Sequence, residues 1–295
     1  MASLRVKSEK AIEIVMILCS LVSVLTTIGI ILVLSVDAFK FFNEVSIFSF
    51  LTDTQWTPLF EDKHFGILSL LSGTLLTTFI AVLMAVPLGI TIAVYLNEYA
   101  SKRFTSIVKP ILEVLAAIPT VVYGFFALQF VTPMLQKIIP GLSGFNALSP
   151  GLVMGIMIIP YITSLSEDAL RAVPRSLREA SYGLGANRFQ TAFRVIVPAA
   201  NSGIIVSVIL AISRALGETM IVAIAAGQEP KLTFNPLESV ETITTYIVQV
   251  SMGDVPQDSL EYRTIFAAGI TLFIFTFLLN NISYWIRKKY SQRYE

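Results

Sequence analysis

An arginine and a glutamate interrupt a long apolar stretch of the sequence. Arg214 and Glu218 lie four residues apart in "SRALGETM", with "IIVSVILAI" before it and "IVAIAAG" after it. On a helix this spacing places both side chains on one face, about one turn apart. The planar guanidinium of arginine donates paired hydrogen bonds to an oxyanion and stays charged, and a neighbouring carboxylate supplies a counter-charge when no anion is bound. The pair therefore predicts a station that binds an oxyanion and releases it.

A structural ion pair that holds helices together is the alternative interpretation. An ionised side chain at the centre of a membrane helix costs about 2.5–3.5 kcal/mol, so two of them need a partner, a water-filled cavity or a function. Arginine before glutamate is also the less favourable order for a helical pair. Together with the family resemblance described below, we favour the oxyanion station, with Glu218 as internal counter-ion of Arg214.

The composition shows that these two residues belong to a membrane protein. Of the 295 residues, 55% are hydrophobic and 14% are charged, whereas a soluble domain carries about 25% charged residues. A helix of about 20 residues crosses the hydrocarbon core of a bilayer. We expect an all-α polytopic protein with six transmembrane helices, near 11–36, 67–96, 107–135, 148–166, 197–227 and 264–286. The first apolar run is longer than the core of a signal peptide, which predicts a retained helix.

The placement of basic residues predicts the orientation. Most of the 21 Lys and Arg residues lie in 1–10, 97–106 (with Lys109), 167–196 and 287–295. The intervening loops 37–66, 136–147 and 228–263 hold Lys40, Lys63, Lys137, Lys231 and Arg263. Basic residues are retained on the cytoplasmic side of a membrane. We therefore expect both the N and the C terminus in the cytoplasm, in agreement with an even number of spans.

The longest predicted cytoplasmic loop has the pattern of two short helices. Ser176 and Glu179 form a capping-box pattern, in which the serine caps a helix start and the glutamate bonds back to it. Gly185 is placed to end that helix in a left-handed conformation. The next segment carries apolar residues on one helical face: Phe189, Phe193 and Val197. This arrangement is typical of a docking element for a soluble partner.

This loop resembles the EAA-x3-G-x9-I-x-L-P motif of ABC-importer permeases. The matching residues are Glu179-Ala180-Ser181, Gly185 and Val195-Ile196-Val197-Pro198, in which Ser181, Val195 and Val197 are mild departures. The resemblance implies a type I importer fold in which Glu179, Ala180, Gly185 and Pro198 couple to an ATPase subunit. It divides the chain into 1–66, with the tail, first helix and outer loop, and a permease domain 67–290 that contains the coupling segment 167–198.

Two further stretches, "SRALGETMIVAIAAG" and "AIPTVVYGFFAL", are similar to the permeases of the bacterial high-affinity phosphate importer (the Pst system), and to the C-type subunit more than to the A-type. The resemblance implies that phosphate contacts Arg214 and Glu218. It also implies four associations: a sister permease of the A type, two copies of an ABC ATPase, an extracytoplasmic phosphate-binding protein, and the inner (plasma) membrane of a bacterium. No contact with nucleic acid is implied.

Other functions find little support in the residues. No Gly-x4-Gly-Lys-Ser/Thr stretch occurs, so we expect ATP and Mg²⁺ on the partner ATPase and no cofactor on this chain. The single cysteine, Cys19, and the single histidine, His64, leave no metal cluster, and no nucleophile–base set indicates an enzyme. A permease for another oxyanion such as sulfate or molybdate, and an ATP-independent channel or transporter, remain as alternatives.

Several polar residues are weaker candidates. Lys109 and Glu113 have the spacing of an interfacial helix pair. Threonines 74, 77 and 78 are candidates to line a pathway or to bond back to their own helix. Asn280 and Asn281 either bridge helices or approach the membrane interface. The acidic outer loops, which include Glu238 and Glu241, indicate either a solvated surface or a landing site for a binding protein.

Overall fold

The structure is a computed structural model that describes the backbone of residues 2–290, with the side chains of 10, 12–286 and 288. Among the predicted cytoplasmic residues, the side chains of Arg5, Lys7, Arg287 and Lys289 and the whole of 291–295 lie outside this description. Within the described residues four helices are long and apolar enough to cross a membrane, and two bent pairs raise the number of spans to as many as six. The four are α1 (Ala2–Glu44), α3 (Leu68–Val94), α7 (Leu148–Arg171) and α14 (Leu260–Tyr290). The all-α expectation is confirmed.

The third span is bent instead of straight. Helix α4 (Lys102–Ala117) meets the segment Thr120–Gln136 at 88°. That segment contains α5 (Thr120–Phe126), a π-helical turn and α6 (Thr132–Gln136). Ile118 and Pro119 are extended at the bend, because proline has no backbone N–H and disfavours helix at the residue before it.

The prediction of one helix over 197–227 is wrong. A short helical segment, α9 (Arg188–Thr191) to α10 (Val197–Ala199), bends by 69° into α11 (Asn201–Leu216). Helix α12 (Met220–Ala225) begins only after a break over 217–219. Gly217 is the C-cap of α11, and glycine is common where a helix ends. The break lies inside "SRALGETM", so Arg214 belongs to the last turn of α11 and Glu218 lies in the break before α12.

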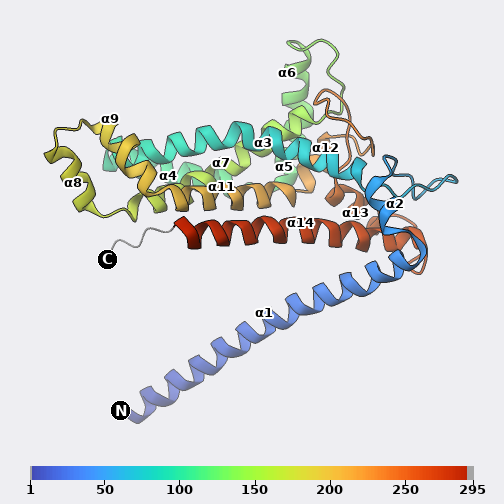
Figure 1. Cartoon of the computed structure of the whole chain (residues 1–295), viewed down its shortest axis with the longest axis horizontal. Helices are drawn as coiled ribbons and strands as arrows, with labels where there is room; N and C mark the ends of the chain where they lie inside the picture. Colours follow the sequence, from blue (N-terminus) through green and yellow to red (C-terminus); the bar gives the residue numbers. More distant parts are fainter. Residues whose placement is uncertain (1, 291–295) are drawn as a thin grey trace.

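Helices α3, α7 and α11 pack together at the centre of the bundle (Figure 1). Two glycines of α7 permit this approach: a Cβ at Gly151 would lie 2.8 Å from the Cβ of Ile80, and one at Gly155 would lie 3.0 Å from a backbone oxygen of α3. The hydroxyls of Ser166 and Ser207, 2.7 Å apart, join α7 to α11. Close helix contact at these small residues is the packing that membrane bundles favour.

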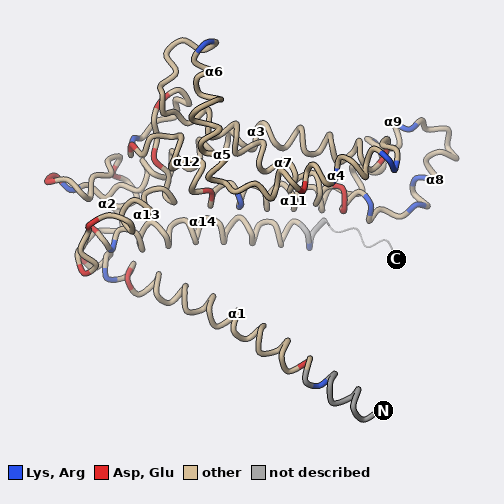
Figure 2. Tube along the Cα trace, turned by 180° about the vertical axis from the view of Figure 1, so that it is seen from behind, with Lys and Arg blue, Asp and Glu red and all other residues tan. Residues whose placement is uncertain are grey.

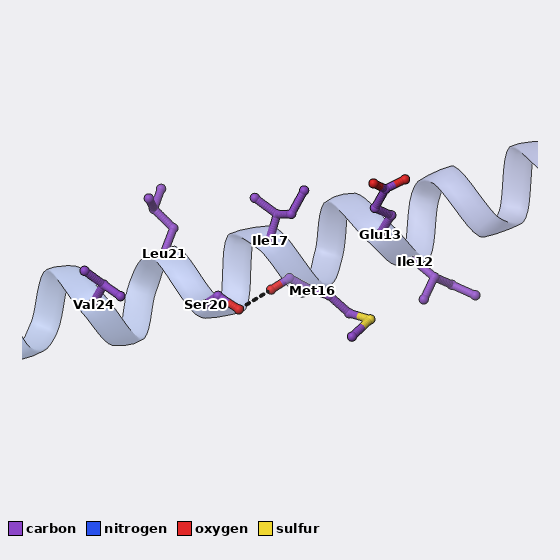
Figure 3. Close-up of a pocket in the computed structure, with 7 residues that line it drawn as sticks. All are labelled: Ile12, Glu13, Met16, Ile17, Ser20, Leu21 and Val24. Carbon is purple, nitrogen blue, oxygen red and sulfur yellow. Dashed lines mark hydrogen bonds between the residues drawn. The ribbon is translucent and has the colours of Figure 1, made fainter. Parts of the chain in front are cut away.

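Helix α1 leaves this bundle along most of its length. It contacts α14 at one end and diverges from it toward the N-terminus (Figure 1). In Figure 3 the side chains from Ile12 to Val24 point away from the helix, and the hydroxyl of Ser20 bonds back to the carbonyl oxygen of Met16. The most apolar window of α1 is 0% buried, so this helix presents apolar surface on every side.

Charged residues gather at the two ends of the bundle (Figure 2). Basic residues surround α8 (Arg175–Gly183) and α9. The opposite end carries α2 (Ile47–Thr52), α13 (Ile243–Met252) and the long loops. There four basic residues each pair with an acid: Lys40 with Asp37, Lys63 with Glu261, Lys231 with Glu238, and Arg263 with Glu44. The acidity of the predicted outer loops is therefore partly neutralised by ion pairs.

Candidate functional site

Arg214 and Glu218 meet at the break between α11 and α12. Arg214 lies in the last turn of α11, and Glu218 follows the Gly217 cap. The Nη1 atom of Arg214 is 3.7 Å from the Oε2 atom of Glu218. The structure thus brings together the two residues that the sequence predicts to interact, across the end of a helix instead of along one.

The two partners differ strongly in burial. The side chain of Glu218 is 3% exposed and that of Arg214 is 41% exposed. The guanidinium also lies 5.9 Å from the ring centroid of Tyr161 on α7, a distance at which a cation is attracted to the ring face. The carboxylate is therefore the enclosed member of the pair, and the arginine reaches the surface of the chain.

Two further elements fix Glu218 in place. Its Oε1 atom accepts a hydrogen bond of 3.4 Å from the N–H of Ile221, in the first turn of α12. Its carbonyl oxygen accepts one of 2.8 Å from the hydroxyl of Thr244, on α13. A buried carboxylate at a helix start is stabilised by such N–H groups. These two bonds tie Glu218 to α12 and α13.

This geometry suits reversible capture of an oxyanion. Arginine has five N–H donors in a planar fork. Among the described residues, the guanidinium of Arg214 contacts one carboxylate oxygen of Glu218, at 3.7 Å, and the ring of Tyr161. Donors that remain accessible can bind two oxygens of a tetrahedral anion. With no anion present, Glu218 compensates the positive charge of Arg214.

The other polar residues of the spans have mainly structural contacts. Thr74 bonds to the carbonyl oxygen of Leu70 and accepts the N–H of Ile243, and Thr77 bonds back to Gly73. The hydroxyl of Thr78 is buried with no partner among the described residues. Asn280 does bridge helices, since its Oδ1 accepts a bond from Ser213 on α11, whereas Asn281 bonds within α14.

The predicted coupling residues lie on the surface of two short helices. Glu179 and Ala180 are exposed on α8, Gly185 follows it with φ +82°, and Pro198 is exposed on α10. The left-handed glycine is as predicted. Exposed aromatic and aliphatic side chains flank them: Tyr182, Leu184, Phe189 and Phe193.

The capping box predicted at Ser176 is wrong. Helix α8 begins at Arg175 with Pro174 as its N-cap, and no side chain caps it. Proline, with φ near −55° here, starts the helix early enough to place Ser176 inside the first turn. A complete capping box forms instead in α9, between Asn187 and Gln190.

Two contacts that sequence reasoning missed hold this segment to the bundle. Arg178 donates to the Oε1 atom of Glu98 at 3.0 Å and to the carbonyl oxygens of Leu170 and Val173. The side chain of Glu98 is 6% exposed. Because 80 residues separate Glu98 from Arg178, the sequence does not predict this pair. The presence of an acid at the end of a membrane span is the one sequence signal that points to Glu98.

The second missed contact joins the short helices. The hydroxyls of Ser181 and Thr191 lie 2.9 Å apart, and both residues are buried between α8 and α9. Ser181 is one of the departures from the motif, where the pattern has alanine. Because the hydroxyl of Ser181 contacts the hydroxyl of Thr191, the serine at this position links α8 to α9.

Glu241 is not the solvated residue that the acidic loop predicts. It is 2% exposed, and its Oε1 atom has no hydrogen-bond partner among the described residues. Its backbone oxygen would lie 2.2 Å from a Cβ at Gly73, so the loop packs directly on α3. The loop returns to the bundle through a bridge between Gly227 and Val240, a tertiary contact that composition alone does not reveal.

Comparison with known proteins identifies the family. The model for "Binding-protein-dependent transport system inner membrane component" matches residues 85–295. A probable ABC transporter permease, YqgH of Bacillus subtilis, is 36% identical over 88% of this chain and 84% of its own length. The phosphate transport system permease protein PstC of Mesorhizobium japonicum is 35% identical over 83% of this chain and 80% of its own length.

Solved structures support the fold. The chain superposes on a bacterial alginate ABC transporter with a TM-score of 0.60 and 18% identity, over 88% of each chain. An inward-facing methionine ABC transporter gives a TM-score of 0.56 with 17% identity, over 77% of this chain and 95% of that one. With these relatives, the chain belongs to the inner membrane components of binding-protein-dependent ABC transporters, non-catalytic multi-pass permeases that work with an ATPase and a binding protein.

Proposed function

We propose that this chain is a permease subunit of an ATP-driven importer of inorganic phosphate. The observation that carries the proposal is the half-exposed guanidinium of Arg214 beside the buried carboxylate of Glu218 at a helix break. The names of relatives such as PstC of Mesorhizobium japonicum and of Haemophilus influenzae support phosphate as the anion. Residues 67–290 form the translocation unit, and 1–66 add a helix and an outer loop to it.

Coupling runs from the exposed short helices to this site. Glu179, Ala180, Gly185 and Pro198 dock on the ATPase, and closure of the ATPase moves α8 and α9. The segment Arg188–Ala199 continues directly into α11, which ends at Arg214. A displacement of the loop therefore reaches the guanidinium through one helix and one bend.

The assembly has the subunits that the resemblance implies. Both termini face the cytoplasm, and two ATPase copies lie below the membrane. A phosphate-binding protein docks on the opposite face. A sister permease of the A type completes the pathway.

Uptake of labelled phosphate by the reconstituted complex tests the proposal. Proteoliposomes that contain the permease pair, the ATPase and the binding protein are expected to accumulate phosphate only when ATP is supplied to the ATPase side. Excess sulfate or molybdate should leave this uptake unchanged. If sulfate or molybdate is carried and phosphate is not, the oxyanion assignment is wrong. Uptake without ATP would contradict the ATP-driven mechanism.

A further inference from the structure

Lys109 does not pair with Glu113, its predicted partner, but with Glu167 on α7. The Nζ atom of Lys109 is 2.9 Å from the Oε1 atom of Glu167, and the side chain of Glu167 is 3% exposed. Arg171, one turn further along α7, contacts the same oxygen. One buried carboxylate thus holds two cations.

A cavity of 340 Å³ opens beside this group, between α4 and α7. Lys109, Glu113, Tyr161 and Glu167 line it, and its other lining residues are mainly apolar or hydroxyl-bearing. The ring of Tyr161 lies under the guanidinium of Arg214. Tyr161 therefore stands between the cavity, which it lines, and Arg214, which does not line it. Since α7 runs from Tyr161 to Glu167 toward α8, the cavity extends from Tyr161 toward the predicted ATPase-docking end.

The shared carboxylate allows Lys109 to change partners at low cost. Removing one partner of a buried ion pair usually leaves an uncompensated charge, which is strongly unfavourable. Glu167 has Arg171 as well, so it stays paired when the ammonium of Lys109 turns to another anion. Glu113 lies on the same cavity wall, and its carboxylate opposes tight retention of an anion there.

We propose that Lys109 is a second anion-binding residue of the pathway, which receives a tetrahedral oxyanion from Arg214 and passes it toward the cytoplasm. Glu167 is its counter-ion and Arg171 compensates Glu167 during the exchange. The inference rests on the proposed function, since it requires that Arg214 carries an oxyanion. A purely structural clamp between α4 and α7 is the competing explanation of the same ion pair.

Opposite effects of two substitutions separate these explanations. Lys109→Gln removes the second station, so phosphate inside the vesicle should inhibit ATP-driven uptake only at about tenfold higher concentration, and uptake itself should fall about tenfold. Glu167→Gln frees Lys109 of its counter-ion, so internal phosphate should inhibit at about tenfold lower concentration. A clamp predicts that both substitutions, which break the same contact, change inhibition in the same direction.

The experiment uses the complete reconstituted transporter with inorganic phosphate as probe. Lys109→Arg should restore uptake, because it keeps the charge. Lys102→Gln, an identical change at an exposed residue of the same helix, is the matched control and should match the wild type. Shifts of inhibition in opposite directions support the second station. Shifts in one direction, or none, overturn it.

Failure of the proposed function gives a different result. If the wild-type complex carries sulfate or molybdate and not phosphate, the phosphate assignment falls, and the same opposite shifts are then expected with the anion that is carried. If it carries phosphate while the two variants do not differ in this way, only the second station falls. If it carries none of these anions, both fall.

Discussion

At the scale of single residues, the Arg214–Glu218 pair combines a buried carboxylate, held in place, with an accessible guanidinium. Glu218 is enclosed and bonded to α12 and α13, whereas the guanidinium reaches the surface of the chain. A transport site must release its ligand as well as bind it. In the proposed site the fixed carboxylate would meet this need, because it would compete with the anion for the same guanidinium.

Glu218→Gln should therefore bind phosphate more tightly and transport it more slowly. The amide keeps the shape and the bond from Ile221 but removes the competing charge. We expect turnover to fall about tenfold, the free-energy equivalent of one charged hydrogen bond, with normal amounts of complex in the membrane. Glu229→Gln, at an exposed loop position, is the control. If Glu218→Gln transports phosphate at the wild-type rate, Glu218 is not a counter-ion that controls release of the anion.

Glu241 gives the protein a pH-dependent stability. Burial raises the pKa of its carboxyl from 4.5 to about 8. Between these values the folded chain binds a proton that the unfolded chain has lost, so the stability contribution falls as the pH rises from 4.5 through 8 and is lowest above 8. Glu241→Gln removes this dependence.

The thermal unfolding midpoint of Glu241→Gln should accordingly exceed that of the wild type at pH 9 and approach it at pH 5. Glu61→Gln, at an exposed position, should show no such trend. Unfolding curves of the purified permease at both pH values measure the difference. A difference that is the same at pH 5 and pH 9 would show that Glu241 is not a buried neutral acid.

At the scale of elements, the predicted coupling segment has buried anchors behind its exposed surface. Arg178 joins α8 to Glu98, in the π-helical turn Tyr95–Tyr99 after α3, and to the end of α7. Arg178→Ala leaves the buried Glu98 without its cationic partner, with the amide of Asn97 as a remaining donor, and loss of one member of a buried ion pair costs about 3–5 kcal/mol. We expect loss of ATPase co-purification and of uptake. Because Arg178 is largely buried, this loss would come from displacement of α8 and not from a lost contact with the ATPase.

Arg103→Ala is the control for this change, because Arg103 is an exposed residue of the neighbouring helix α4. It should retain the ATPase. The double variant Glu98→Gln with Arg178→Ala removes both charges and should recover part of the binding. If Arg178→Ala alone keeps the ATPase and full uptake, the anchor does not position α8.

The sequence predicts the elements of this fold better than their interruptions. Apolar runs of about 20 residues are a direct physical requirement of the bilayer, so the long helices follow from composition. The break at Gly217 cannot be predicted from composition, because glycine is also common inside membrane helices where they pack. The burial of Glu241 and the pairing of Lys109 with Glu167 depend on tertiary packing between distant segments.

At the scale of the whole molecule, the orientation is open to a direct test. In a Cys19→Ala background, Leu184→Cys places a thiol on the predicted coupling segment 167–198, where the native side chain is 91% exposed. Phe60→Cys places one on the opposite loop, where the side chain is 67% exposed. A membrane-impermeant maleimide should label Phe60→Cys in spheroplasts and Leu184→Cys only in inverted vesicles. The reverse labelling would place the termini outside the cytoplasm.

The central claim, that Arg214 carries phosphate through an ATP-driven permease, is tested most directly by the ratio of phosphate imported to ATP hydrolysed. In the reconstituted complex Arg214→Ala should abolish phosphate uptake, while ATP hydrolysis stimulated by the binding protein continues, because the docking segment is intact. The ratio should therefore fall toward zero. An unchanged ratio in Arg214→Ala, with phosphate still imported, would contradict the account.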